Sequence, residues 1–420
     1  MRIRSLTRTP WLIAAVLLML LAVSCSDDGG GESGSATTVD PADCPGEPIK
    51  LISISTLSGG PTGGDTAERS KIGTDAALST INGECTLGRP IDLTRCDDKF
   101  DVNGSLECGR QAASGDYLAL MSSIGGFDDG AVAAGLPGIF LLGTSAFDLT
   151  DENAYSSISG VTVGLGGVSA AKAAGGKNMV LVLPDTPALQ FVSTQVEQAG
   201  REMGIEVETL LIPVDTTDFA PIAAQVAERD ADSVGLLPVA PVPMINALAD
   251  EGITPDTYTM SIASLVMTPD VVDELGSALD GMLVVSPTFP PTDEDNEGIA
   301  ELRADLEAIG HDPDDPEVDF NTVQSWSNLK RLEAALLAAG PDVVESLDSQ
   351  SLVDAVVANP IDRPEAAPYD FRENQLPELP ELASFRIFMR DVAILTVEDG
   401  KYVSLSDGFV DVLDPPSSLG

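Results

Sequence analysis

The chain has 420 residues, of which 43% are hydrophobic and 21% are charged, so it contains enough apolar material for a substantial core. Acidic residues outnumber basic ones by 67 to 22, which gives a formal net charge of −45. A surface this acidic repels nucleic acid and anionic membrane surfaces, which excludes a nucleic-acid-binding function. We interpret the acidity as a solvated exterior in an extracytoplasmic medium rather than as a cation-binding feature.

The first 24 residues have the pattern of a bacterial secretory signal peptide. Arg2, Arg4 and Arg8 precede an uncharged and mainly apolar run that is too short to predict a membrane span. Small residues lead from this run into Cys25, which resembles the lipobox of bacterial lipoproteins, although Ala22 replaces the usual leucine. This resemblance implies that Cys25 receives a lipid; a plain cleaved signal peptide is the alternative.

Residues 25–47 are expected to form a flexible tether, because those from 26 to 40 are mainly glycine, serine, threonine and acids. The rest of the chain is long enough for two domains of ordinary size. We therefore expect a two-domain protein that a lipid holds at the bilayer surface.

Four cysteines, Cys44, Cys85, Cys96 and Cys108, follow the signal peptide. An even number of cysteines outside the reducing cytosol favours two disulfides. Zinc is the competing interpretation, but His311 is the single histidine and no Cys-x-x-Cys pair occurs. Four cysteines allow three pairings, among which the shortest loops favour Cys96 with Cys108 and Cys44 with Cys85.

From residue 49 onward, short apolar runs alternate with segments of helical period, the pattern of βα units around a mainly parallel sheet. Strands are expected at residues 50–56, 91–94, 117–124 and 139–143. Helices are expected around residues 72–81, after Asn103 and after Asp129. These elements predict a first sheet.

A second series begins at residue 179. Strands are expected at residues 179–183, 205–212, 233–237, 258–261 and 282–285, with helical stripes at residues 189–203 and 219–226. Residues 287–291 are proline-rich and predict a rigid connector between lobes. Helices at 296–309, 321–339 and 343–358 then precede strands at 385–389, 392–397 and 402–405. Trp326 is expected in the core, and Asp399-Gly400 in a hairpin turn.

Several stretches in this layout resemble the leucine/isoleucine/valine-binding family, the type I substrate-binding proteins of ABC transporters. The most specific are Leu57–Gly60, Leu136–Thr150 and Thr217–Val234, within a resemblance that covers residues 48–405. The resemblance implies an α/β fold of two lobes joined by three crossovers, with a small-molecule ligand between them. We expect residues 48–160 with 290–365 to form lobe 1, and residues 161–289 with 366–420 to form lobe 2.

The candidate ligand residues of lobe 1 lie on loops that follow strands, where open α/β sheets bind ligands. They are Ser58, Gly59, Gly125, Gly126, Phe127, Thr144 and Ser145. The glycines serve equally well for tight turning, and Thr144 and Ser145 for helix capping. The resemblance implies that the Thr144-Ser145 pair helps to hold an α-amino group.

In lobe 2 the resemblance places Asp185, Thr186, Ser261 and Ser264 at the ligand. The family's serine partner for a ligand carboxylate has no counterpart in Gly125-Gly126-Phe127, and residues 261–264 contain no acid for an ammonium group. A neutral or less polar molecule therefore fits about as well as an amino acid.

Catalytic and cofactor motifs are weak. His311 lies in a proline-broken acidic turn, which does not fit a catalytic triad or an EF-hand. Residues 164–169 are one residue short of a dinucleotide fingerprint and are expected to form a glycine-rich connector between lobes. We expect no metal or cofactor. The favoured function is a lipid-anchored solute-binding protein that serves an ABC permease; a ligand sensor and a secreted α/β enzyme are the alternatives.

Overall fold

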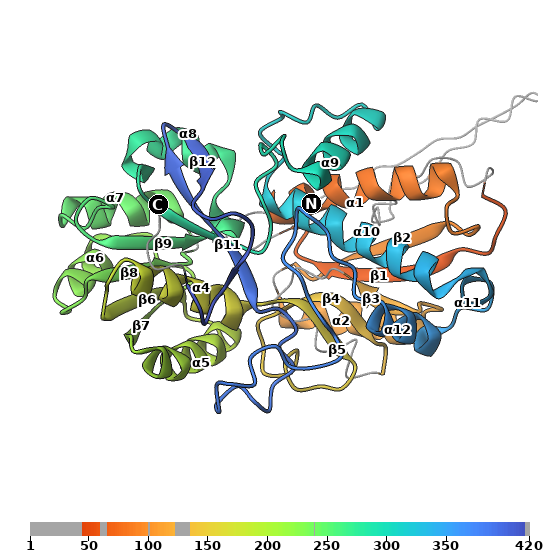
Figure 1. The fold of residues 1–420 in the computed structure, drawn as a ribbon, viewed down its shortest axis with the longest axis horizontal. Helices are drawn as coiled ribbons and strands as arrows, with labels where there is room; N and C mark the ends of the chain where they lie inside the picture. Colours follow the sequence, from red (N-terminus) through yellow and green to blue (C-terminus); the bar gives the residue numbers. More distant parts are fainter. Residues whose placement is uncertain (1–43, 59–64, 100, 122–134, 239, 416–420) are drawn as a thin grey trace, which may run out of the picture. The chain divides into compact units, whose positions relative to one another are not determined.

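A computed structural model describes residues 44–58, 65–99, 101–121, 135–238 and 240–415 (Figure 1). The predictions for the signal peptide, for Cys25, for Gly59, for residues 125–127 and for a helix after Asp129 lie outside these residues. Within them, no helix has both the length and the hydropathy needed to cross a membrane.

The first sheet contains five parallel strands in the order β2-β1-β3-β4-β5. They are β1 (Ile49–Ser55), β2 (Ile91–Asp97), β3 (Ala119–Met121), β4 (Gly138–Gly143) and β5 (Ala154–Ser159). β1, β3 and β4 are buried along nearly their whole length, because helices cover both faces of this sheet. The sequence predicts the first four strands but not β5.

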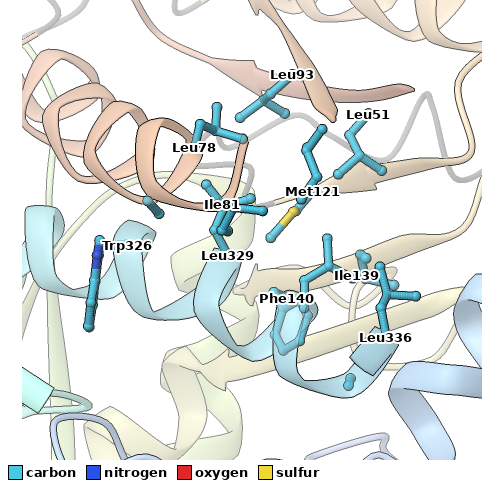
Figure 2. Close-up of a cluster of buried hydrophobic side chains, with 14 of the residues drawn as sticks. Leu51, Leu78, Ile81, Leu93, Met121, Ile139, Phe140, Trp326, Leu329 and Leu336 are labelled. Atoms are coloured by element: carbon cyan, nitrogen blue, oxygen red, sulfur yellow. The ribbon is translucent and has the colours of Figure 1, made fainter. Parts of the chain in front are cut away.

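The helices packed on this sheet come from two distant parts of the sequence. They are α1 (Asp65–Glu84), α2 (Val102–Ser114), α9 (Glu297–Ala308), α10 (Phe320–Ala339), α11 (Pro341–Glu345) and α12 (Ser349–Ala358). Figure 2 shows Trp326 and Leu329 of α10 beside Leu78 and Ile81 of α1. Trp326 is fully buried, as expected, and its indole N–H donates to Asp305 at 2.8 Å.

The second sheet has the strand order β12-β11-β10-β9-β8-β6-β7, with β13 paired to β11. Its strands are β6 (Asn178–Pro184), β7 (Glu206–Ile212), β8 (Ser233–Leu236), β9 (Thr259–Ala263), β10 (Leu283–Ser286), β11 (Asp391–Glu398), β12 (Lys401–Ser404) and β13 (Val410–Asp411). β6 to β10 pair in parallel, whereas β11 to β13 are antiparallel. Asp399 and Gly400 join β11 to β12 with positive φ angles of 50° and 73°, which confirms the expected turn.

Helices also cover both faces of the second sheet. They are α4 (Gly160–Ala173), α5 (Pro187–Met203), α6 (Ala220–Ala227), α7 (Pro241–Asp250) and α8 (Pro269–Leu275), with short 3₁₀ turns η2 (Ser264–Val266) and η3 (Gly276–Leu279). α4 and α5 share one hydrophobic core with the sheet. α6, α7 and α8 share another core on the opposite face.

Along the described residues, the chain passes three times between the regions of the two sheets: before α4, before α9 and before β11. The last two passages pair with each other. The Phe289 N–H donates to the Glu365 carbonyl at 2.9 Å, and the Ala367 N–H donates to the Pro287 carbonyl at 2.8 Å. The buried guanidinium of Arg331 donates to the carbonyls of Ala366 and Ala367. This α10 side chain therefore fixes the last passage to α10.

Two disulfides join Cys44 to Cys85 and Cys96 to Cys108, the pairing that short loops favour. Their sequence separations of 41 and 12 residues correspond to about 4 and about 3 kcal/mol of stabilisation by the loop-entropy relation. The first also holds the end of the predicted tether, since Cys44 is buried.

Three expectations are wrong in detail. Residues 164–169 lie inside α4 instead of forming a connector, and the region 343–358 is two helices because Asp348 caps a new helix with Ser351. Residues 385–389 are not a strand: Met389 makes one isolated bridge, to Tyr369. Ile387, Phe388 and Met389 are buried as an irregular segment, and this burial explains their apolar pattern.

Candidate functional site

A cavity of about 120 Å³ is lined by elements of both sheets. A single water needs about 10–15 Å³ on this scale, so the space suits a larger molecule. From the first sheet and its helices come Thr66, Phe140, Leu142, Thr144, Ile158, Phe320, Asn321, Gln324, Ser325 and Asn328. From α4, α5, the second sheet and the segments after its strands come Gly160, Val163, Gly164, Gly167, Met179, Leu181, Leu183, Leu189, Val192, Gly235, Leu236, Leu237, Ser261, Ile262, Ala263, Ser264, Leu265, Val285 and Pro287.

The part of the cavity beside the second sheet lies between α4 and the strands. Met179, Leu181 and Leu183 alternate along β6, so their side chains share the face that α4 covers. Gly164 and Gly167 come from α4 on the other side. A cavity wall therefore forms where the sequence pattern suggests only a hydrophobic core.

Phe140 enters the cavity wall through an irregularity in β4. The register of β4 against β5 shifts around Phe140, and the φ angle of this residue is 52°. A positive φ is uncommon for an aromatic residue, and bulges of this kind redirect a side chain next to functional sites. The ring lies edge-on to Tyr369, with 5.5 Å between centroids, so aromatic packing supports its position.

Polar atoms at the end of the cavity near the first sheet come from α10 and from the loop after β4. The side-chain amide of Asn328 donates to the Phe140 carbonyl at 3.4 Å. Within the described residues, the Gln324 amide and the Thr144 hydroxyl have no hydrogen-bond partner. These two groups are free to bind a solute.

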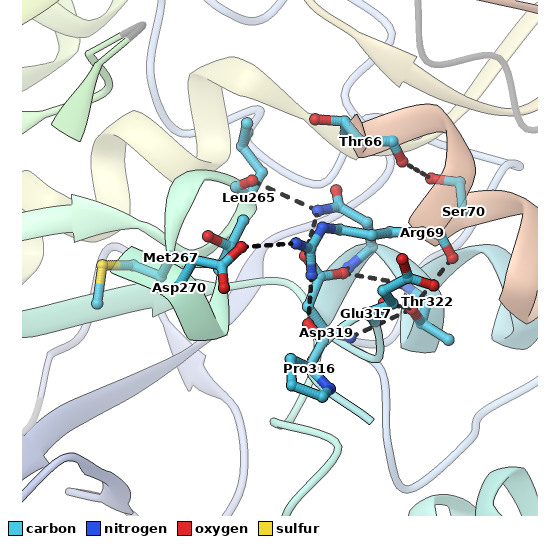
Figure 3. Close-up of polar contacts among 12 residues, drawn as sticks. Thr66, Arg69, Ser70, Leu265, Met267, Asp270, Pro316, Glu317, Asp319 and Thr322 are labelled. Atoms are coloured by element: carbon cyan, nitrogen blue, oxygen red, sulfur yellow. Dashed lines mark hydrogen bonds and ion pairs between the residues drawn. The ribbon is translucent and has the colours of Figure 1, made fainter. Parts of the chain in front are cut away.

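A buried ion pair precedes the first turn of α10 (Figure 3). Asp319 caps this helix by accepting from the N–H groups of Asn321 and Thr322, and Arg69 of α1 lies 3.8 Å from its carboxylate. Burial raises the pKa of Asp319 above its ordinary value, although Arg69 opposes the shift. Arg69 also donates to the Pro316 carbonyl at 2.6 Å and reaches the exposed Asp270 of α8 at 3.5 Å. The ion pair thus supports the turn that presents Phe320 and Asn321 to the cavity.

None of the described residues that line the cavity is acidic, basic or histidine. The loop after β4 also offers little to an anion, because Asp148 accepts from the N–H groups of Thr144 and Ser145 at 3.2 and 3.0 Å. An ionised solute group would lose its hydration in this part of the cavity without gaining an opposite charge. The described lining therefore fits a mainly apolar molecule.

The structure brings three of the predicted ligand residues, Thr144, Ser261 and Ser264, to the cavity. Ser261 lies within β9, which agrees with the strand expected at residues 258–261, and Ser264 begins the short turn η2 that follows.

The other described candidates lie outside the lining and have partners within the fold. The Ser58 hydroxyl donates to Asp97 at 2.6 Å, and the Ser145 hydroxyl accepts from the Asp148 N–H at 3.1 Å. Asp185 accepts from Gln190, and Thr186 caps α5. Ser145 therefore caps a turn and not the expected helix, since residues 146–150 are a turn. A ligand contact stays a prediction for these four residues.

Sequence reasoning missed the contribution of α4, β6 and α10 to the cavity. A signal for α10 was present, because Gln324, Ser325 and Asn328 interrupt an apolar helix at three- and four-residue steps. Nothing in the sequence indicates that Gly164 and Gly167 line a cavity, because their role depends on the sheet against which α4 packs.

Comparisons with known proteins agree with this architecture. Residues 48–401 match the model of a family described as periplasmic binding protein. A search of curated proteins finds no match.

Several solved structures share the fold. A solute-binding protein of an ABC transporter from Rhodopseudomonas palustris HaA2, in complex with p-hydroxybenzoic acid, has 18% identity and a TM-score of 0.70, covering 88% of this chain and 98% of that one. A fatty acid ABC transporter substrate-binding protein from Thermomonospora curvata has 14% identity and a TM-score of 0.69, covering 87% and 94%. An ABC transporter substrate-binding protein from Sphaerobacter thermophilus has 18% identity and a TM-score of 0.68, covering 88% and 100%.

Proposed function

The chain belongs to the periplasmic binding protein family, and from this premise we propose that it is a lipid-anchored solute-binding protein that captures a small, mainly apolar molecule and delivers it to an ABC permease. The cavity lined by elements of both sheets carries this proposal. A solute in that cavity contacts both lobes at once and so favours their closed arrangement. The passages around residues 287–289 and 365–367 are the natural hinge, because they pair with each other between the two sheets.

The solute class follows from the lining. Leucine, isoleucine, valine, methionine and phenylalanine side chains form most of the described surface, and the polar groups are hydroxyls and amides. Two structures with the same fold agree with a solute that has a large apolar part, since one contains p-hydroxybenzoic acid and another is named for fatty acids. Both of those molecules also carry a carboxyl group, for which the described lining of this chain has no cation. An amino acid, which the resemblance implies, carries an ammonium and a carboxylate group, and the described lining has no charged side chain to pair with either.

A solute screen on the mature chain tests this function. We expect aromatic or aliphatic solutes such as p-hydroxybenzamide, benzamide and decanol to raise the melting temperature in a concentration-dependent way, and leucine to leave it unchanged. A solute that binds only the folded state adds about 2.7 kcal/mol at a hundredfold excess over its Kd. If leucine is the only solute that stabilises the chain, the proposed solute class changes from apolar molecules to amino acids. A flat response to every solute would contradict solute capture.

The lipid anchor is tested separately on the full chain expressed in a bacterium. Cys25→Ala should abolish lipid attachment, because the apolar run ends at this cysteine and a flexible segment follows it. The native protein should fractionate with membranes and the variant should not. Mass spectrometry of the N-terminal peptide checks the modification directly, and an unmodified Cys25 in the native protein would disprove the lipoprotein assignment.

We do not propose an enzyme. The described cavity lining contains no histidine, cysteine, aspartate or glutamate that could act as nucleophile or general base. The proposal therefore rests on binding and release.

A further inference from the structure

The inner end of the cavity is a slot between α4 and the second sheet. Gly167 of α4 approaches Met179 of β6, whereas Gly164 faces Val196 of α5. Gly164, Gly167, Met179 and Leu181 all line the cavity. A Cβ atom at Gly167 would lie 3.1 Å from the Ser261 hydroxyl and 3.3 Å from the Met179 Cε atom. At Gly167, α4 thus packs closely on the sheet with no side chain between them, and a larger residue there would press on Ser261 and Met179 or extend into the adjoining cavity.

Ser261 places a free hydroxyl in this apolar slot. The residue is only 4% exposed, and its Oγ atom lies toward Gly167 and Gly235. Within the described residues it has no hydrogen-bond partner, although it lines the cavity. A buried hydroxyl normally has a partner, because leaving it without one is costly. Unlike the unpartnered hydroxyls of Ser156 and Ser169, this one lines the cavity, so a bound molecule can supply its partner.

The partner of Ser261 must be uncharged. The residues around it are glycines, methionine, leucine and valine, and none of the described lining residues carries a charge. An ionised group in the slot would be desolvated with only one hydroxyl to compensate. A hydroxyl, carbonyl or amine N–H can instead form a single neutral hydrogen bond there.

We infer that the slot is the inner subsite of the cavity, and that Ser261 binds an uncharged polar atom at the buried end of a mainly apolar solute. This inference rests on the proposed function and names its solute class. Thr144 and Gln324 lie toward the first sheet, where they contact the opposite end of the solute. The subsite explains why Ser261, on a strand inside lobe 2, is polar.

Two fluorescent probes test the charge of the solute. N-phenyl-1-naphthylamine is neutral and has one N–H donor, whereas 8-anilino-1-naphthalenesulfonate has the same aromatic core with an added sulfonate. We expect the neutral probe to bind the mature chain with blue-shifted emission and at least about tenfold more tightly than the sulfonate. Equal or tighter binding of the sulfonate, or no binding of the neutral probe, would overturn the inference.

Two variants test the place of binding. Ser261→Ala should weaken the neutral probe about tenfold by removing one hydrogen bond, and Gly167→Leu should abolish its binding by filling the slot. Ser169→Ala is the matched control, because Ser169 is a buried α4 serine whose hydroxyl also lacks a partner but does not line the cavity. Unchanged affinity in Ser261→Ala would overturn the subsite even if Gly167→Leu failed to fold.

The outcomes separate this inference from the proposed function. If the chain prefers the sulfonate probe but is stabilised by solutes, the solute-binding function stands and only the uncharged solute class is disproved. If the chain binds neither probe and responds to no solute, both the function and the subsite are disproved.

Discussion

Gly73→Leu is expected to lower the free energy of unfolding by about 4 kcal/mol or to prevent folding of the first lobe. Gly73 lies where α1 crosses α10, the helix that carries Gln324 and Asn328. A Cβ atom at this position would collide with the Thr322 carbonyl and would lie 2.5 Å from the Ser325 hydroxyl. The first of these groups is backbone, so a change of side-chain rotamer cannot relieve the contact. The helices must separate, which opens the core shown in Figure 2.

Gly83→Leu is the matched control, since Gly83 is an exposed residue of the same helix and a Cβ atom there would have no other atom within 4 Å. Leucine has the higher helix propensity, so this variant should be unchanged or up to about 1 kcal/mol more stable. Urea unfolding followed by circular dichroism compares the two. Equal stability of both variants would show that α1 and α10 do not need their close approach.

The same contact links stability to binding. Thr322 and Ser325 belong to the first turns of α10, and Ser325 also donates to the Ser70 carbonyl of α1 at 2.8 Å. A milder variant, Gly73→Ala, that still folds should therefore weaken solute binding, because it shifts the turn that carries Gln324.

Most of the fold could be predicted from the sequence. Apolar runs such as 179–183 and 205–212 are long enough to show their period, and cysteine number with loop length was sufficient for the disulfides. β5 was missed because its sequence, AYSSIS, is half serine, although most of the strand is buried. One of its serines, Ser157, donates to Asn328 of α10, and only the tertiary structure reveals that partner.

The candidate site could be predicted only in part, because the rule that ligands lie beyond strand ends locates loops and not cavities. It selected Thr144 and Ser264, which line the cavity and whose contact with a ligand stays a prediction. It also selected Ser145, whose hydroxyl and N–H are used by Asp148 three residues later. The family resemblance is confirmed at the level of periplasmic binding proteins, whereas the small-molecule solute of this chain, an amino acid or a less polar compound, is untested.

Arg69→Leu is expected to destabilise the protein by about 3–5 kcal/mol at pH 8, because it leaves the buried Asp319 carboxylate without its cation. Arg69 is the α1 side chain at the centre of Figure 3, and its partner Asp319 is 2% exposed. The two positions are far apart in sequence, so the loss also weakens the attachment of the α10 N-terminus to α1. Probe binding should fall in parallel, since Phe320 and Asn321 follow directly and line the cavity.

The penalty should depend on pH in a defined direction. Burial raises the pKa of Asp319 above 3.8, so between that value and the raised pKa the folded state holds a proton that the unfolded state has lost. Stability therefore falls as pH rises through this window, and removing Arg69 raises the pKa further and widens the window. As the pH is lowered into this window, Asp319 becomes protonated at a higher pH in the variant than in the native protein. The difference from the native protein should then shrink to about 1 kcal/mol, the net contribution of the hydrogen bond to the Pro316 carbonyl, because Pro316 is exposed and water can replace the lost donor.

Two further substitutions identify the responsible acid. Asp319→Asn in the Arg69→Leu background should recover most of the loss at pH 8, because asparagine keeps an oxygen for the helix cap and has no charge. Asp270→Asn in the native background should change stability by less than about 0.5 kcal/mol, since its side chain is 79% exposed and its contact with Arg69 is 3.5 Å long. Urea unfolding of the four proteins at pH 4 and pH 8 provides the comparison. A penalty that is independent of pH, or one that Asp270→Asn reproduces, would assign the role of Arg69 to the surface contact with α8 instead of the buried start of α10.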